Sequence, residues 1–366
     1  MDAAAATPIN AEVLQGMLPY FTTEFGNAES VHNFGRDAKK SVENAKKQVA
    51  KAINADPSEI HFTSGATEAN RWVINGMVRN SESHRVIVSA IEHPSIHELC
   101  MKLRKDGYTV DFIEVDRNGV VSMSDLVAKL SKPAALVSVI TANHEVGTIQ
   151  YVHTIAQMCR KYGVPFHTDA SLAIGSVHID VKEMQIDALS LSSHKIYGPK
   201  GVGALYIRSG LPISKVQSGT LNVPGIVGFG NAVEITMRDA STNNSRLKAL
   251  RDYMVREIES KFDYIYLNGS KTQRLPNNIN LSFSGIPSEM MLVTLDMEGI
   301  TVGTGADLSP TLDAMHTPPE LSRSAIRFTL LRGTTKDDID FVITKLQKLV
   351  KKLRSLSGVS VYKRGL

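Results

Sequence analysis

The feature that most constrains the fold is an alternation of short apolar runs with helical segments between residues 60 and 208. Several runs, such as 135–140, are apolar almost throughout, as in strands of a sheet covered on both faces. Because helical segments separate the runs, we expect an α/β unit with a largely parallel sheet. The expected strands are 60–62, 85–89, 109–114, 135–140, 164–168, 188–191 and 203–207, with helices at 66–79, 95–106, 123–131 and 152–162.

After residue 208 the order of elements changes. Two helices are expected first, separated by a polar capping segment at 242–245. We therefore predict an N-terminal arm over 1–15 that joins a smaller domain, a large domain over 16–243, and a small α+β domain over 244–366. The further expected elements are helices 37–54, 225–239, 245–262, 287–298 and 335–354, and strands 264–267, 278–283, 300–303 and 324–330.

The composition excludes several classes of protein. The chain has 366 residues, of which 42% are hydrophobic and 21% charged, as in ordinary globular proteins. Its net charge of +4 is spread along the chain, so no nucleic-acid role is implied. Two cysteines are too few for a disulfide framework, and they lack metal-ligand spacing. No apolar run approaches the roughly 18 residues of a membrane span, and we expect a cytoplasmic protein.

Lys195 lies between a predicted buried strand and a Gly-Pro turn, in the run Ser-Ser-His-Lys-Ile-Tyr-Gly-Pro-Lys-Gly-Val-Gly over 192–203. A lysine in this position is held in place, unlike one on a surface helix. Held away from water, it has a lowered pKa and can form a Schiff base with a carbonyl. Most lysines are exposed, so this prediction depends on the neighbours of Lys195.

Polar residues also follow four other predicted strands. The segment 63–68 opens a helix, where backbone N–H groups would bind an anion or a hydroxyl would cap the helix. His93 would stack on a flat cofactor or remain a polar loop residue. Asp169 ends a strand and would pair with a cationic ring nitrogen or cap a turn. A polar cluster at 141–148 follows the fourth strand.

These strand ends together offer an anion cradle, a flat ring, an acid and a lysine. A pyridoxal phosphate (PLP) site needs a phosphate cradle, a partner for the pyridinium nitrogen and a lysine that forms a Schiff base. The occurrence of all of them in one α/β domain predicts a PLP site.

Motifs of one enzyme family recur along nearly the whole chain. The matching segments are 2–8, Phe-Thr-Ser-Gly-Ala-Thr-Glu at 62–68, 92–93, 145–150, 167–170, 192–203, 218–220, 222–225 and Ala-Ile-Arg-Phe at 325–328. The chain thus resembles the class V aminotransferase-fold enzymes of the cysteine desulfurase (NifS/IscS-like) family. The resemblance implies the aspartate aminotransferase-like fold (fold type I) of PLP-dependent transferases, with a mainly parallel seven-stranded sheet.

The resemblance also assigns the residues that hold the cofactor. It implies that Lys195 forms the Schiff base, that His93 stacks on the ring and acts in catalysis, and that Asp169 pairs with the pyridinium nitrogen. The remaining implied cofactor-binding residues are Ala66, Thr67, His144, Ser192 and His194.

Three further roles concern the substrate and the subunits. Arg327 would bind the carboxylate of an amino-acid substrate through its planar fork, with Asn27 near that end. The alternative for Arg327 is a structural ion pair. Thr220 would reach the phosphate from the other subunit, which implies a homodimer.

The loop 303–310 departs from the family, whose members carry sulfur on a cysteine there. Here it is Gly-Thr-Gly-Ala-Asp-Leu-Ser-Pro, so that Asp307 or Leu308 takes the place of the cysteine, and Asp307 becomes a candidate catalytic residue. Cys100 and Cys159 fall inside predicted helices as small core residues. Persulfide transfer by the usual route is therefore not expected.

Three other departures lie around the cofactor. His144 and Leu172 replace an asparagine and a glutamine that address the phenolic oxygen of the PLP ring in the family. The segment 210–217 lacks the family's glycine-rich, arginine-bearing loop. The hydrogen bonding and the shape of the pocket should therefore differ from those of the family.

We expect an enzyme that acts on cysteine or a related β-substituted amino acid, by β-elimination or direct C–S lysis. Three alternatives remain. The first is a cysteine desulfurase of weak or altered mechanism that relies on an external thiol. The second is a non-catalytic desulfurase-like binding partner, and the third is an aminotransferase.

Overall fold

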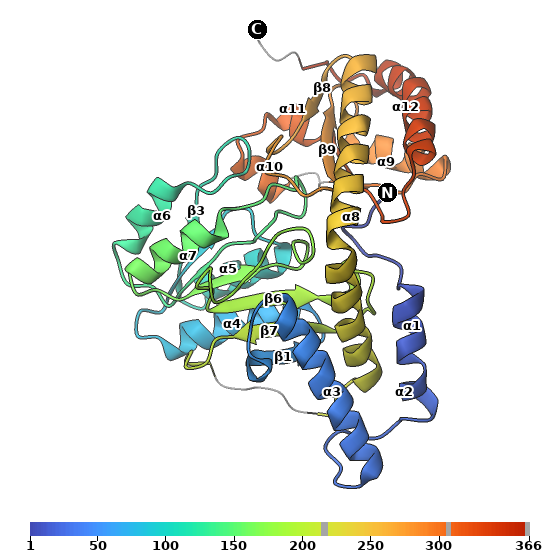
Figure 1. The fold of residues 1–366 in the computed structure, drawn as a ribbon. Helices are drawn as coiled ribbons and strands as arrows, with labels where there is room; N and C mark the ends of the chain where they lie inside the picture. Colours follow the sequence, from blue (N-terminus) through green and yellow to red (C-terminus); the bar gives the residue numbers. More distant parts are fainter. Residues whose placement is uncertain (214–218, 305–308, 363–366) are drawn as a thin grey trace.

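A seven-stranded sheet forms the centre of the larger part of the molecule (Figure 1). The computed structural model describes residues 1–213, 219–304 and 309–362. The strands are β1 (Ile60–Thr63), β2 (Arg85–Ser89), β3 (Thr109–Ile113), β4 (Leu136–Ser138), β5 (Phe166–Asp169), β6 (Ala188–Ser192) and β7 (Gly203–Ile207). Their order is β1-β7-β6-β5-β4-β2-β3, and only the pairs that involve β7 are antiparallel. The predicted mainly parallel sheet is therefore confirmed.

Helices cover both faces of this sheet, which explains its continuous apolar strands. In β2, Val86 and Val88 are buried with residues of α4 and α5, whereas Ile87 is buried with residues of α3, α6, α7 and α8 on the other face. Successive side chains of a strand point to opposite faces, so each of the three needs an apolar neighbour on its own side. The helices are α3 (Asn33–Ala52), α4 (Ala66–Asn80), α5 (Pro94–Lys105), α6 (Met123–Leu130), α7 (Val152–Lys161) and α8 (Val223–Lys261).

The break that we predicted at 242–245 is wrong, because α8 is one continuous helix of 39 residues. Its N-terminal half is buried against the seven-stranded sheet, and its C-terminal half against a second core (Figure 1). Asn244 does not cap a helix, since its Nδ2 donates to Gly175 O at 2.7 Å. Tertiary packing at both ends thus overrides a weak local signal.

The domain limits remain a prediction. Despite the length of α8, no helix of the described residues is apolar enough over a sufficient length to cross a membrane.

A second, four-stranded antiparallel sheet forms the smaller part of the molecule. Its core joins residues of β9 and β11 to apolar side chains of α8, α9 and α12. Two short helices that we did not predict, α10 and α11, lie between β10 and β11. The elements are β8 (Ile265–Leu267), β9 (Asn278–Phe283), α9 (Ser288–Met297), β10 (Gly303–Thr304), α10 (Pro310–Ala314), α11 (Pro319–Ser322), β11 (Ala325–Thr329) and α12 (Lys336–Ser357).

The first residues of the chain connect the two sheets. Ala3 N donates to Thr329 O of β11 at 3.3 Å, and Thr7 N donates to His194 O, just after β6, at 3.0 Å. Residues between these two points therefore lie near the strand ends of both sheets. The remaining elements are α1 (Ala11–Met17), α2 (Pro19–Thr22) and the single 3₁₀ turns η1 (Pro57–Glu59) and η2 (Ser193–Lys195).

Candidate active site

The strand ends of the seven-stranded sheet border a hollow of about 560 Å³. Residues of the N-terminal segment and of β11 complete its wall. Nine of the predicted site residues line this hollow: Ala66, Thr67, His93, His144, Asp169, Ser192, His194, Lys195 and Arg327. They come from positions up to 261 residues apart, and the fold brings them to one place.

Lys195 ends η2, directly after β6, and its amine is largely buried. Its Nζ donates to the carbonyl oxygens of Ala4 at 2.5 Å and Ala5 at 2.9 Å. Burial, together with the nearby positive charge of Arg327, lowers the pKa of Lys195 to about 8, while Asp169 acts in the opposite direction. About a tenth of this amine is therefore unprotonated at pH 7, far more than for an ordinary lysine, and the neutral form is the one that a nucleophilic lysine requires.

Asp169 ends β5 and is held through both carboxylate oxygens. Oδ2 accepts from Asn70 Nδ2 at 2.8 Å, and Oδ1 accepts from Ser171 N at 2.9 Å and Ser171 Oγ at 2.6 Å. Sequence reasoning missed both partners. Asn70 was detectable, because it is a polar residue on the buried face of α4, beside Ala69 and Val73.

The N-terminus of α4 faces the same hollow. No side chain caps the helix, and Ser64 instead donates from its N and Oγ to Glu68 Oε2, at 2.6 and 2.7 Å. The alternative that a hydroxyl caps this helix is therefore wrong, and its first N–H groups remain available for an anion. Ser192 Oγ lies 3.0 Å from His194 Nδ1. Burial, with the charge of Lys195 beside it, lowers the pKa of His194 to about 4.

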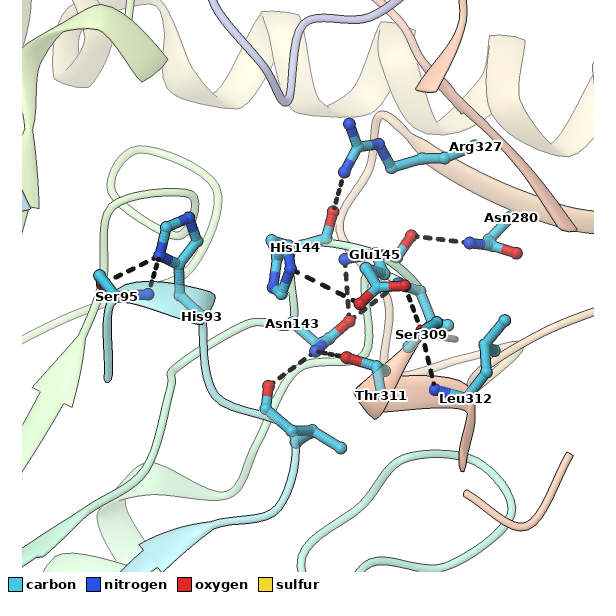
Figure 2. Close-up of polar contacts among 12 residues, drawn as sticks. His93, Ser95, Asn143, His144, Glu145, Asn280, Ser309, Thr311, Leu312 and Arg327 are labelled. Carbon is cyan, nitrogen blue, oxygen red and sulfur yellow. Dashed lines mark hydrogen bonds and ion pairs between the residues drawn. The ribbon is translucent and has the colours of Figure 1, made fainter. Parts of the chain in front are cut away.

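His93 both caps α5 and lines the hollow, and the stacking of its ring on a cofactor remains a prediction. Its Nδ1 accepts from Ser95 N at 3.2 Å and lies 2.9 Å from Ser95 Oγ (Figure 2). Burial is the main cause that lowers the pKa of His93. Because Nδ1 is engaged at the helix end, Nε2 is the nitrogen left for a ligand.

Arg327 forms a structural ion pair, the alternative that its sequence context left open, and its binding of a substrate carboxylate remains a prediction. Nη2 donates to Asp2 Oδ1 at 2.9 Å, and Nη1 donates to His144 O at 3.0 Å (Figure 2). Its cross-strand partner Gly303 leaves room for the guanidinium, since an added Cβ there would lie 2.5 Å from Nη2. The partner in this ion pair, Asp2, was not predicted, and its contact shows that a carboxylate fits against Arg327 at the edge of the hollow.

The polar cluster after β4 forms a buried network (Figure 2). Asn143 Oδ1 accepts from the N–H groups of Glu145 and Val146, both at 2.9 Å, and fixes the turn. Glu145 Oε2 accepts from Ser309 Oγ at 2.5 Å, and Oε1 lies 3.6 Å from His144 Nε2. Burial raises the pKa of Glu145 and lowers that of His144 well below its ordinary value.

Three predicted site residues are not among those that line the hollow. Asn27 is exposed, and its Oδ1 accepts from Glu29 N at 3.0 Å. Thr220 is exposed and lines a neighbouring hollow together with Ser64. Asp307 lies outside the described residues. The roles of all three remain predictions.

A model of the class-V aminotransferase family matches residues 1–213 and 210–342 of this chain. The chain belongs to the class-V aminotransferase family. Cysteine desulfurase IscS of Dictyoglomus turgidum is 40% identical to it over 376 residues, which is 98% of this chain and 95% of the relative. Cysteine desulfurase IscS of Clostridium botulinum is 42% identical over 378 residues, with the same shares.

Solved structures agree with this assignment. A NifS-like protein superposes with a TM-score of 0.91 at 32% identity, over 96% of this chain and 99% of that one. A NifS-like protein from Rickettsia africae gives a TM-score of 0.89 at 28% identity, over 96% and 98%. The predicted fold and the resemblance to class V enzymes are thereby confirmed.

This class-V enzyme depends on PLP, as its family does. The residues that line the hollow have the chemistry that a PLP site requires. Lys195 supplies a buried amine of lowered pKa, Asp169 a fixed carboxylate, and the uncapped end of α4 a set of free N–H groups. His93 supplies a flat ring in the same wall. No cluster among the described residues has the composition of a metal site.

The buried amine leads to a first testable expectation. With PLP removed, acetylation of Lys195 should be half-maximal near pH 8 and nearly complete by pH 10, because the neutral amine is the reactive form. Mass spectrometry of the Lys195 peptide, labelled briefly at a series of pH values, measures this midpoint. A midpoint near 10.5 would contradict the effect of burial, and the exposed Lys161 at the end of α7 serves as the internal comparison.

Proposed function

We propose that this class-V enzyme cleaves the C–S bond of cysteine or a related β-substituted amino acid by β-elimination, without a sulfur-carrying cysteine. Its relatives are named cysteine desulfurases, which supports a sulfur-containing amino acid as substrate. The observation that carries the proposal is that both cysteines of the chain are buried. Cys100 in α5 and Cys159 in α7 are both 0% exposed, and burial raises the pKa of each thiol to about 12. Neither is accessible as a thiolate, the form that attacks sulfur.

Each residue of the hollow would have a separate role in this reaction. Lys195 would hold the cofactor and remove the proton from the α-carbon of the amino acid at Nζ. Asp169 would keep a proton on the ring nitrogen, and His93 would lie against the ring. Arg327 would bind the substrate carboxylate in the place of Asp2. PLP, when bound, supplies the electron sink for the charge that develops at the α-carbon.

The phosphate of the cofactor would lie at the end of α4. There the free N–H groups and the helix dipole favour an anion. The hydroxyls of Thr67 and Ser192 line the same wall, together with His194. The phosphate would then lie at the seven-stranded sheet, and the amino acid would lie on the Arg327 side of the hollow.

The products distinguish this proposal from its alternatives. Purified enzyme given cysteine, cystine and cysteine conjugates should yield pyruvate and ammonia, together with sulfide or the corresponding thiol. Alanine with sulfide would indicate desulfuration instead, and transfer of the amino group to a keto acid would indicate an aminotransferase. The absence of any product with PLP bound would favour a non-catalytic binding partner.

A variant without cysteine tests whether a protein thiol carries sulfur. In Cys100→Ala/Cys159→Ala, we expect pyruvate formation from cysteine to stay within about threefold of the wild type, since no thiol takes part. The two buried substitutions should lower the free energy of unfolding by about 1 kcal/mol each, so activity is compared well below the unfolding temperature. Loss of sulfide release in a folded variant, or alkylation-sensitive radiosulfur on the wild type, would support a desulfurase of altered mechanism.

We further propose that the enzyme is a homodimer in which Thr220 reaches the phosphate of the other subunit. Thr220 is exposed and does not line the hollow of its own chain. Large apolar side chains near the N-terminus are also exposed, among them Phe25 at 68% and Val31 at 87%, as in surfaces that a partner covers. Sedimentation of the purified protein distinguishes a dimer from a monomer.

A further inference from the structure

His144 is placed in the hollow by a rigid backbone. Asn143 fixes the turn from one side, and Arg327 holds the carbonyl oxygen of His144 from the other, with the Nη1–O distance at 3.0 Å (Figure 2). The imidazole is 16% exposed, and its centroid lies 5.1 Å from that of His93. His144 therefore lies between the ring that would face the cofactor and the guanidinium that would bind the substrate.

The surroundings of this imidazole are those of an acid–base group. Glu145 Oε1 lies 3.6 Å from Nε2, and Ser309 holds the other carboxylate oxygen. Nδ1 is buried and has no hydrogen-bond partner within the described part of the chain. A buried polar atom without a partner is rare, and a structural histidine would normally be fixed at both nitrogens. A carboxylate behind an imidazole is the usual arrangement that supports a proton-transferring histidine.

The charges around His144 favour release of a proton. Burial is the main cause that lowers its pKa, followed by the charges of His93, which caps α5, Arg327 from β11 and Lys195 from η2. Glu145 is the carboxylate that faces it. In the empty hollow the neutral form of the imidazole is therefore favoured. A substrate carboxylate on Arg327 would offset part of the positive charge, so that binding of the amino acid itself favours protonation of His144.

We propose that His144 is the proton donor to the group that leaves the β-carbon, an inference that rests on the proposed β-elimination. The α-ammonium of the bound amino acid gives a proton to an imidazole nitrogen. Lys195 then takes the proton of the α-carbon, and the electron pair left there forms the Cα–Cβ double bond. The Cβ–S bond breaks with its electron pair going to sulfur. The imidazolium protonates that sulfur, which leaves as hydrogen sulfide, and His144 is neutral again.

A comparison of two leaving groups tests this role. The probes are L-cysteine, whose sulfur needs a proton, and β-chloro-L-alanine, whose chloride leaves without one. His144→Asn should lower kcat for cysteine by about 10²-fold or more, within the range for a positioned acid. Its kcat for β-chloro-L-alanine should stay within about threefold. Because both substrates are measured on the same holoenzyme preparation, a folding defect cancels in the ratio.

His144→Gln is the second variant and should show the same ratio. His178→Asn is the matched control, since His178 Nε2 lies 3.7 Å from Glu183 in an exposed pair. It should change neither rate. Equal loss with both substrates, or no loss, would overturn the role of His144 while leaving β-elimination intact. If the wild type forms pyruvate from neither substrate, the proposed function itself falls, and this inference with it.

Discussion

Lys195→Ala is expected to abolish amino-acid turnover, with kcat lowered by about 10³-fold or more. The expected loss is in the upper part of the range for a positioned acid–base group, because the variant also removes the proposed covalent anchor of the cofactor. The side chain adds little to stability, since its only hydrogen bonds in the described residues go to the carbonyls of Ala4 and Ala5. Steady-state pyruvate formation and the circular dichroism spectrum of the same sample measure both effects.

Two further variants distinguish chemistry from charge. Lys195→Arg keeps a cation near the Ala4 and Ala5 carbonyls but cannot attach the cofactor, so it should be as inactive as the alanine variant. Lys161→Ala, at the exposed end of α7, should keep full activity. Borohydride reduction and peptide mapping should find PLP on the Lys195 peptide of the wild type only. Turnover by Lys195→Arg above about a tenth of the wild-type rate would refute a nucleophilic role.

The α/β part of the fold was predictable because its signal is both local and strong. Runs such as 135–140 are apolar on both faces, a pattern that polar loops and amphipathic helices do not produce. The continuity of α8 was not predictable from the polar run at 242–245. The two halves of α8 pack into hydrophobic cores that belong to different sheets, and the Asn244 side chain donates a hydrogen bond to Gly175 O instead of capping a helix.

The site was predictable where a strand end carries the functional side chain. Asp169 and Lys195 each follow a buried strand, and the sheet brings such ends together. The hydrogen-bond and ion-pair partners of the site residues were not predictable. Asn70 reaches Asp169 across 99 positions, and Asp2 reaches Arg327 across 325. Such hydrogen-bond partners are brought together by the packing of whole helices and strands, so the local sequence around either residue indicates the contact weakly or not at all.

Asp169→Asn is expected to lower kcat/KM by about 10²-fold while leaving the fold intact. The variant would remove the proposed charge-assisted interaction with the ring nitrogen, worth about 1.5–3 kcal/mol, and each 1.36 kcal/mol is tenfold in rate. Stability should change little. Asn70 Oδ1 is buried without a partner among the described residues, so a turned-over Asn70 amide can accept from the new side chain.

Removal of this carboxylate should also change the titration of its neighbour. Asp169 raises the pKa of Lys195, so in the cofactor-free variant the midpoint of Lys195 acetylation should move below about 8. Asp169→Ala removes the acceptor of Asn70 Nδ2, which keeps only its bond to Ser95 Oγ, and of both Ser171 donors. Each lost partner of a buried group costs about 1–3 kcal/mol, so this variant should unfold at a lower temperature than Asp169→Asn.

Asp180→Asn is the matched control for the hydrogen-bonding role of Asp169. Asp180 also accepts from an asparagine amide, Asn54 Nδ2 at 2.8 Å, and from backbone N–H groups, those of Lys182 and Glu183. It is half-buried in a surface turn and does not line the hollow, so its substitution removes similar hydrogen bonds away from the cofactor. Full activity there and a loss in Asp169→Asn would assign the effect to charge at the ring nitrogen. A similar loss in both variants would mean that Asp169 acts only through its turn.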